Sequence, residues 1–338
     1  MTNDSEPILL DKFISSFIDL GGTFDNVRIE NGQFGLGLFI ADPKKKFRVH
    51  VPEDLLLETK FANLNFLKKI SINKQSGWSR SKRLFFSNYQ KCCGWNARSF
   101  EKVFRHQTAL QGLPQEVARQ LDGFGVESNS KKRLTYKYLF HKHMSSRTIF
   151  YKGNSVIMPV IELFNHSDVG RPFIFNGGIE IQGKGSGEIF SRYHSAMDGF
   201  DFFNLYGFSN NPILGYSCTT NIKVHKENIS IIRSSQSEPK SKLIWKHHKN
   251  RELDRGILFR DVLLKDAISP DKPMKIFVER CLKYGLAAST SKDIFQGLLR
   301  HNTLVTKDFL GTIRSMEFSL KPVISQVVER HLELLCTR

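Results

Sequence analysis

The stretch Met158-Pro-Val-Ile-Glu-Leu-Phe-Asn165-His166-Ser167 places an Asn-His pair at the end of an apolar run. Further along the chain, Gly187-Glu-Ile-Phe-Ser-Arg-Tyr193 again mixes polar residues with apolar and aromatic ones. An aromatic-rich segment then ends in Tyr206-Gly207-Phe208. Polar groups with fixed hydrogen-bond roles lie among apolar and aromatic residues, a pattern typical of a small-molecule site. We therefore expect residues 158–208 to build the functional site.

Length and composition indicate a chain with a sizeable core. Its 338 residues suggest two domains, or one large domain with an appendage. Hydrophobic residues make up 40% of the chain, and the 28 Phe residues predict aromatic packing or aromatic-lined pockets. There is no apolar run long enough for a transmembrane helix, and the polar, acidic N-terminus differs from a secretory signal. The expected location is the cytoplasm, with the nucleus as the alternative in a eukaryote.

Charge and cysteine content narrow the classes of partner and cofactor. The net charge of +17 favours an acidic partner, with nucleic acid or a ribonucleoprotein as the obvious class. Basic residues cluster at Lys44–Lys46, Lys131–Arg133 and Lys240–Arg251. Each cluster by itself indicates no more than a solvent-exposed basic surface. The five cysteines lack the paired spacing of a zinc site or a disulfide framework, so no metal is expected.

Hydrophobic periodicity predicts a mixed order of elements. The helical stripe of residues 8–20 ends at Gly21-Gly22. Between Pro52 and about residue 142 the texture is mostly helical, and the region from Glu252 to the end also has helical spacing. Strands are expected at 27–29, 35–41, 47–51, 156–158, 173–182, 187–193 and 220–234. We expect a hairpin turn at Gly177-Gly178 and a linker over residues 234–241.

Two short motifs could belong to a ligand-binding site, but each of them also has a purely structural explanation. Gly35-Leu36-Gly37 lets backbone approach a ligand or take positive φ, although a plain turn or bulge is the commoner reason for such a motif. It lacks the third glycine, following helix and acidic residue of a dinucleotide-binding fingerprint. Asn165-His166 suits the edge of a heterocycle, because both side chains accept and donate hydrogen bonds. A satisfied polar pair at a strand end is the alternative.

Tyr193 and Tyr206 form the third candidate group. Phenols near a reactive centre can orient an amine, hydrogen-bond a polarised methyl group or offer a π face to a cation. Core tyrosines with partnered hydroxyls are the alternative.

The glycine motif, the Asn-His pair and the two tyrosines, taken in their order along the chain, resemble the motifs of the SET-domain protein methyltransferases. The resemblance comprises Gly35-Leu36-Gly37, the Val51-Pro52 step, Ser146-Arg147, Asn165-His166-Ser167, Gly187-Glu188 with Tyr193, and Tyr206-Gly207-Phe208. The long helical insertion and helical tail are most similar to the subgroup typified by Rubisco large-subunit lysine methyltransferase. The motifs that carry this resemblance lie within roughly residues 20–217.

The resemblance implies an α+β fold with three parts. An N-terminal helix (1–20) precedes a SET domain of short curved β-sheets (21–234), which contains a helical insertion (53–145). An all-helical C-terminal domain (235–338) resembles the subgroup's substrate-binding domain.

The resemblance also implies a cofactor, S-adenosylmethionine, and a role for each matching residue. Gly35, Leu36 and Gly37 would lie against the cofactor, and Arg147 would pair with its carboxylate. Asn165 and His166 would hold its adenosyl and amino-acid portions. Tyr206, at the methyl-transfer pore, and Tyr193, lining the target channel, are the implied catalytic residues. Phe208 would complete the aromatic wall of the cofactor site.

The implied activity is methylation of a lysine side chain of a protein, with histidine as the alternative acceptor. The basic charge suggests an acidic or ribosome-associated target. The sequence departs from the subgroup at Asp198-Gly199, where a Ser-Asn step is usual, and one residue is missing between Glu188 and Tyr193. Two other classes therefore stay open: a SET-like binding module with little turnover, and a basic nucleic-acid-binding protein. We expect no membrane association.

Overall fold

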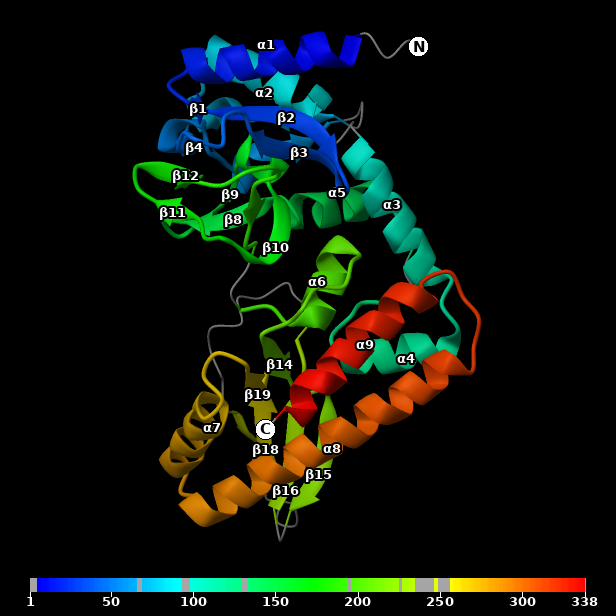
Figure 1. The fold of residues 1–338 in the computed structure, drawn as a ribbon. Helices are drawn as coiled ribbons and strands as arrows, with labels where there is room; N and C mark the ends of the chain where they lie inside the picture. The colour runs from blue at the N-terminus through cyan, green and yellow to red at the C-terminus, as the bar shows by residue number, and fades with distance from the viewer. Residues whose placement is uncertain are drawn as a thin grey trace. The chain divides into compact units, whose positions relative to one another are not determined.

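The structure is a computed structural model, and it describes residues 5–65, 69–92, 98–128, 133–193, 196–224, 227–234, 246–248 and 256–337. The chain divides into two compact units (Figure 1). The first unit holds Met1–Arg105 and Leu134–Ser195, and the second holds His106–Arg133 and Ala196–Arg338. Each unit therefore combines two separate segments of the chain.

Short β-sheets form the centre of the first unit. The largest is antiparallel with the order β1-β4-β12-β11, and smaller ones are β2-β3, β5-β9-β8, β6-β7 and the parallel pair β10-β13. The strand bounds are β1 Thr23–Asp25, β2 Val27–Gly32, β3 Gly35–Ile40, β4 Phe47–Pro52, β5 Leu57–Glu58, β6 Ala62–Leu64, β7 Ile70–Ile72, β8 Thr148–Tyr151, β9 Asn154–Ile157, β10 Asn165–Arg171, β11 Ile174–Phe175, β12 Gly178–Gly183 and β13 Phe190–Ser191.

Strand β4 shows why these residues form strands. Phe47, Val49 and Val51 are buried, and the intervening Arg48 and His50 point to the other face. This two-residue alternation gives a sheet one face in the core and one toward solvent.

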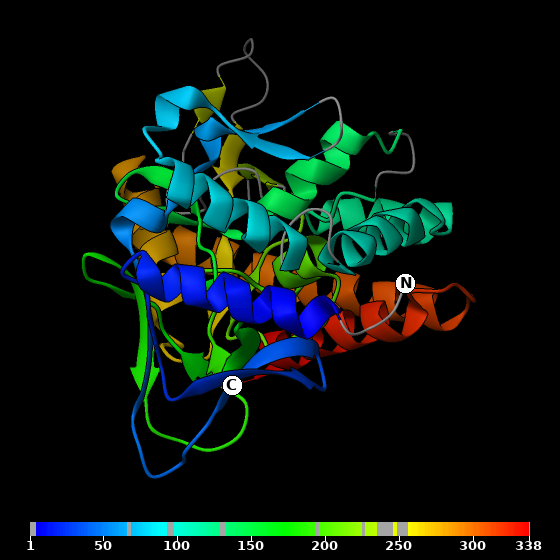
Figure 2. The same ribbon diagram turned by 90° about the horizontal axis from the view of Figure 1, so that it is seen from above.

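Aromatic rings join helices α1 (Ser5–Asp19) and α2 (Arg80–Cys92), which lie side by side in Figures 1 and 2. Phe13 stacks on Phe85 with ring centroids 5.4 Å apart, and Phe17 and Tyr89 complete a fully buried group. Aromatic pairs at such distances add to the free energy already gained by area burial.

The remaining helix of the first unit is α5 (Tyr136–Ser145), which leads into Arg147 and β8. Helix α3 (Arg98–Gln111) contains the division between the units at residues 105 and 106.

The second unit packs helices against a small sheet. Its strands follow the order β15-β16-β18-β17, with β14 and β19 as a separate pair. The core joins rings from three segments: Phe124 stacks on Phe200 at 4.2 Å and on Phe309 at 5.9 Å. The bounds are α4 Gln115–Gly123, α6 Gly199–Tyr206, β14 Leu214–Tyr216, β15 Thr220–Val224, β16 Glu227–Ile232, β17 Lys246–His248, β18 Gly256–Arg260, β19 Leu263–Asp266, α7 Lys272–Lys283, α8 Ala288–Arg314 and α9 Lys321–Cys336.

Within the described residues, no helix has the length and apolar content needed to cross a membrane.

Several predictions from sequence are confirmed. The chain is α+β, an N-terminal helix ends just before Gly21-Gly22, and strands occupy the predicted places at β2, β3 and β4. Helix α3 covers residues 98–111, within the stretch from Pro52 to about residue 142 that was predicted to be mostly helical. Gly177-Gly178 turns the chain between β11 and β12, and both glycines have positive φ. Residues 220–224 and 227–232 are strands, as predicted for 220–234.

Other predictions were wrong in detail. The Leu-rich segment after Pro52 was expected to be helical, but it forms short 3-10 turns at Glu53–Leu55 and Thr59–Phe61 with strands β5 and β6 between and after them. Helix α2 lies within the stretch that was predicted to be mostly helical. Residues 235–338 are not all helical, because β18 and β19 precede α7 and β18 pairs in parallel with β16. The periodicity of two in such short strands is hard to separate from helical spacing.

The predicted domain boundary after residue 234 falls inside the second unit. Most of the predicted linker, residues 235–241, lies outside the described residues.

The aromatic junction of α1 and α2 gives a testable prediction. Phe13→Ala should lower the free energy of unfolding by about 3–5 kcal/mol, because it removes a fully buried ring and leaves a cavity. Urea unfolding followed by circular dichroism measures the change. The matched control is Ile18→Ala on the same helix, whose side chain is 51% exposed and should cost at most about 0.5 kcal/mol. Equal losses in both variants would contradict the packing described for Phe13.

Candidate functional site

Strand β3 carries Gly35, Leu36 and Gly37. Gly35 has φ +101°, a conformation that favours glycine, and it pairs with Gly32 at the end of the β2-β3 hairpin. The far side of β3 binds the segment after Gly187: the Ile40 amide donates to the Gly187 carbonyl (2.9 Å), and the Ile189 amide donates to Leu38 (2.7 Å). The strand is therefore held along both edges.

Asn165 lies against this strand. It opens β10, which runs parallel to β13 with Asn165 opposite Phe190. Its Nδ2 donates to Glu188 Oε1 at 2.6 Å and, more weakly, to the Leu36 carbonyl at 3.5 Å. The structure therefore brings together Gly35–Gly37 and Asn165, as the sequence predicted.

Gly37 is required for a reason that the sequence did not show. A Cβ at this position would lie 2.6 Å from Glu188 Oε1 and 2.9 Å from Asn165 Nδ2. Real side chains do not approach so closely, so any larger residue would separate the amide from the carboxylate. The missing side chain of Gly37 makes room for two protein groups.

His166 and Tyr193 are neighbours, with ring centroids 5.1 Å apart. The Tyr193 amide donates to His166 Nδ1 (3.3 Å), so Nδ1 is unprotonated and the neutral ring carries its proton on Nε2, which faces Asp168 Oδ1 at 3.2 Å. The Tyr193 hydroxyl donates to the Phe164 carbonyl at 2.6 Å. Burial raises the pKa of Tyr193 well above its usual range, so the phenol stays neutral.

Arg147 reaches a buried carboxyl group. Its Nη1 donates to Ser146 Oγ (3.0 Å), and its Nε lies 3.6 Å from Glu162 Oε2 without a hydrogen-bond partner among the described residues. The Tyr89 hydroxyl donates to the same Glu162 oxygen at 2.6 Å. Burial raises the pKa of Glu162 to about 7, although Arg147 and Tyr89 both lower it.

Glu162 and Glu188 were not among the predicted site residues. Glu162 accepts a hydrogen bond from Tyr89 and lies 3.6 Å from Arg147, and Glu188 accepts one from Asn165. The signal for Glu162 was a single carboxyl inside an apolar run, where an ionisable residue must find partners or change its pKa.

The backbone before Asn165 is strained. Val160 has φ +70° and ψ −51°, and the Ile161 amide donates to the Pro159 carbonyl (2.9 Å), which defines a γ-turn. This conformation is costly for a β-branched residue. Strain of this kind is concentrated at functional sites, and here it lies directly before the Asn-His pair.

Tyr206 and Phe208 belong to the second unit. Tyr206 ends helix α6, and Gly207 closes the helix with φ +77°. The rings of Phe202, Tyr206 and Phe208 form a cluster with centroids 5.6–6.0 Å apart. A side chain at Gly207 would meet the His106 ring at 3.0 Å. These three rings therefore form one aromatic group within this unit.

Asp198 has a structural role. From the sequence, Asp198-Gly199 was noted only as a departure from the SET-domain subgroup that left a binding module open, and in the structure Asp198 is fully buried and caps α6. Its Oδ1 accepts from the Asp201 amide (3.0 Å), and Asp201 Oδ2 accepts from the Asp198 amide (3.2 Å). This reciprocal pair is a capping box, and an acidic residue three positions after Asp198 was its sequence signal.

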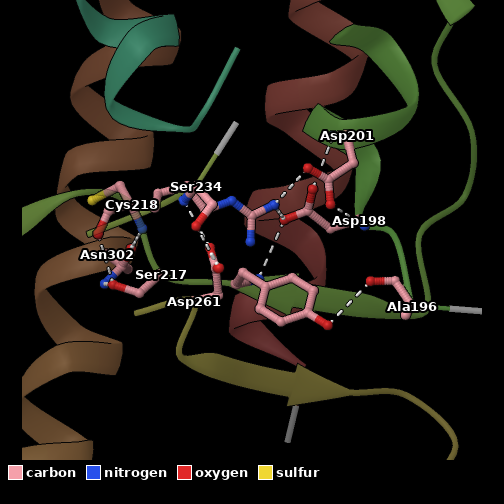
Figure 3. Close-up of polar contacts among 10 residues, drawn as sticks. Ala196, Asp198, Asp201, Ser217, Cys218, Ser234, Asp261 and Asn302 are labelled. Atoms are coloured by element: carbon pink, nitrogen blue, oxygen red, sulfur yellow. Dashed lines mark hydrogen bonds and ion pairs between the residues drawn. The ribbon is translucent and has the colours of Figure 1, made fainter. Parts of the chain in front are cut away.

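Arg233 neutralises the two capping carboxylates (Figure 3). Its Nη2 forms ion pairs with Asp198 Oδ2 (2.9 Å) and Asp201 Oδ1 (3.0 Å), at angles that do not make hydrogen bonds. The guanidinium also lies 4.5 Å from the centre of the Tyr216 ring. Burying such charges without partners would cost several kcal/mol each, so the start of α6 depends on Arg233.

Comparison with known proteins gives only a distant likeness. No protein-family model matches the chain, and no curated protein matches it. Three similar solved structures are the SET domain of LSMT bound to lysine and AdoHcy, Rubisco LSMT bound to AdoMet, and Rubisco LSMT bound to sinefungin and monomethyllysine. Each is 12% identical and covers 97% of this chain and 89% of its own, with TM-scores of 0.44, 0.43 and 0.42. The geometry of this chain's own residues must therefore carry any functional assignment.

The Arg233 cluster predicts a large loss of stability. Arg233→Met should lower the free energy of unfolding by about 3–5 kcal/mol, because it leaves buried carboxylates without a cation. Chemical denaturation at neutral pH measures this loss. As a control, Arg314→Met breaks an exposed ion pair with Glu329 and should cost about 0–1 kcal/mol. A loss as small as that of the control would show that Arg233 does not hold the capping carboxylates.

Glu162 predicts a pH dependence of defined sign. Between pH 4.5 and about 7 the folded protein keeps a proton on Glu162 that the unfolded chain has released. This contribution to stability is complete below pH 4.5 and is lost as the pH rises through 7. Relative to wild type, Glu162→Gln should gain about 3 kcal/mol between pH 4.5 and 8, at about 1.4 kcal/mol per pKa unit.

Unfolding of both proteins at several pH values measures this gain. The control is Tyr89→Phe, which keeps the carboxyl group but removes a hydrogen bond that lowers its pKa. The pH dependence should therefore persist in this variant with its midpoint moved upward. A difference between Glu162→Gln and wild type that does not vary with pH would contradict the raised pKa.

Proposed function

We propose that this chain is an S-adenosylmethionine-dependent protein methyltransferase that acts on a lysine side chain, with histidine as the alternative acceptor. The observation that carries the proposal is the assembly in the first unit. Asn165 lies against the Gly35–Gly37 strand, and the Tyr193 hydroxyl donates to the carbonyl of Phe164, the residue directly before Asn165. These residues come from distant parts of the sequence, and their order along the chain resembles that of SET-domain methyltransferases.

The polar groups of this assembly fit the amino-acid end of the cofactor. A free guanidinium edge suits a carboxylate, and Arg147 Nε has no hydrogen-bond partner among the described residues. The Asn165 amide lies beside the glycine strand, and it would hold the remainder of the cofactor together with the His166 ring. The resemblance assigns the aromatic wall of the cofactor site to Tyr206 and Phe208. The residues present therefore suit S-adenosylmethionine.

The chemistry places clear demands on these residues. When bound, S-adenosylmethionine would supply an electrophilic methyl group on a sulfonium. The protein must hold a nitrogen lone pair in line with that methyl at about 3 Å. A lysine has a pKa near ~10.4, so the channel must disfavour its ammonium form, and apolar walls do so by desolvation.

The two tyrosines would orient the acceptor. Tyr193 stays neutral, and its hydroxyl proton is committed to the Phe164 carbonyl. The resemblance places this side chain at the channel that would admit the target amine. Tyr206, the tyrosine assigned to the transfer pore, would hydrogen-bond the polarised methyl group or the amine.

The partner is proposed to be a protein, acidic or ribosome-associated, because the net charge is +17. Nucleic acid would be met through the basic surface alone, and the cytoplasm or a nucleus is the proposed location. Methylation of ribosomal fractions compared with a soluble acidic protein distinguishes the two target classes.

The alternative of a binding module with little turnover rested on Asp198-Gly199. The capping box and the Arg233 ion pairs now account for Asp198 by stability alone. This alternative therefore loses its main support, and it remains an outcome of the following test.

Tyr206→Phe should lower methyl transfer about 10²-fold, the loss typical of removing one hydrogen-bond donor from a reacting centre. Incubation of each protein with labelled S-adenosylmethionine and a cell lysate measures the transfer. The matched control, Tyr284→Phe in the second unit, changes a tyrosine that ends α7 and should keep the wild-type rate. Equal rates for wild type and Tyr206→Phe would remove the assigned role, and cofactor binding without any transfer would favour the binding module.

A further inference from the structure

Glu188 is fixed beside the glycine strand. Its backbone forms an antiparallel bridge with Phe39, and its neighbours Gly187 and Ile189 bond to β3 on either side. Its carboxylate lies across the hairpin, where Oε2 is 2.8 Å from the position of a Cβ on Gly32 and Oε1 is 2.6 Å from one on Gly37. Two glycines thus make room for this one side chain.

The carboxylate fixes the orientation of the Asn165 amide. A carboxylate only accepts hydrogen bonds, so the amide nitrogen of Asn165 must face Glu188 Oε1. The second bond of Nδ2 goes to the Leu36 carbonyl. With its donors directed into the protein, Asn165 can offer a ligand only its carbonyl Oδ1. The pair Asn165 and Glu188 is therefore an acceptor-only site.

The negative charge of the Glu188 carboxylate has no cationic partner among the described residues. Among the described residues, no Lys, Arg or His forms an ion pair with Glu188, and Oε2 accepts no hydrogen bond from them. One ammonium group of this region, Lys102 Nζ, bonds instead to the Phe34 carbonyl at 3.2 Å. A half-buried carboxylate beside an outward amide oxygen favours a ligand that brings positive charge and several N–H donors.

We propose that Glu188 Oε2 and Asn165 Oδ1 bind the α-ammonium group of S-adenosylmethionine, which adds Glu188 to the cofactor-binding residues. The inference rests on the proposed function. It gives the two charges of the cofactor's amino-acid end separate partners of opposite sign, since Arg147 is assigned to the carboxylate. A ligand without the ammonium group would leave the Glu188 carboxylate uncompensated, so the pair also acts in specificity.

Glu188→Gln tests this assignment while preserving the local fold. The Gln carbonyl can still accept from Asn165 Nδ2, and the new amide nitrogen takes the place of Oε2, where it repels an ammonium group. Titration calorimetry should show S-adenosylmethionine binding weakened about tenfold or more, the loss of a charge-assisted hydrogen bond. Binding of the analogue that lacks the α-amino group should not change between wild type and variant.

The matched control is Glu30→Gln. It removes the same formal charge from the same hairpin, but Glu30 already pairs with Arg28 at 2.8 Å, so cofactor binding should stay at the wild-type level. Thermal unfolding of each variant verifies that it is folded.

Three results would overturn the inference. Equal cofactor affinity in wild type and Glu188→Gln excludes the ammonium contact while leaving the proposed function intact. Equal weakening of the cofactor and the deaminated analogue would show that Glu188 acts by holding Asn165. Failure of the wild-type protein to bind S-adenosylmethionine would remove the proposed function itself, and the inference with it.

Discussion

The hydrogen bond from the Asn165 amide to the Glu188 carboxylate is the contact on which the candidate site depends. It joins strand β10, strand β3 and the segment before β13, which are far apart in sequence. The contact exists only because Gly37 has no side chain to separate the two groups. Once it forms, it fixes which atom of Asn165 faces outward, and so decides what kind of group the site can bind.

A second constraint governs the other unit. Asp198 and Asp201 cap α6 by accepting backbone N–H groups, which stabilises the helix start. Their burial demands a cation, and Arg233 supplies it from the residue after β16. The helix that carries Tyr206 therefore depends on a residue that sequence reasoning had assigned to no function.

These two constraints show how buried charge is handled in this protein. Around Arg233, charges of opposite sign are paired. Around Glu162, burial outweighs the nearby Arg147 and the pKa rises to about 7. At Glu188 the carboxylate keeps one neutral donor, Asn165, and has no cation among the described residues. The last two lie in the unit that holds the proposed cofactor site, where unbalanced charge can be used to recognise a ligand.

The sequence by itself determined the α+β class, the N-terminal helix, the early strands and the grouping of Gly35–Gly37 with Asn165. Local periodicity and glycine placement carry the helix and the strands, whereas the α+β class and the grouping of Gly35–Gly37 with Asn165 come from the resemblance to SET-domain methyltransferases. Tertiary structure alone decided that Asp198 caps a helix, that β18 and β19 join the C-terminal region, and that Glu188 contacts Asn165 while Glu162 lies near Arg147. These outcomes depend on partners distant in sequence, such as Arg233 for Asp198 and Asn165 for Glu188. An ion pair or hydrogen bond between residues far apart in the sequence does not produce a repeating pattern of residue types, so it cannot be found from periodicity.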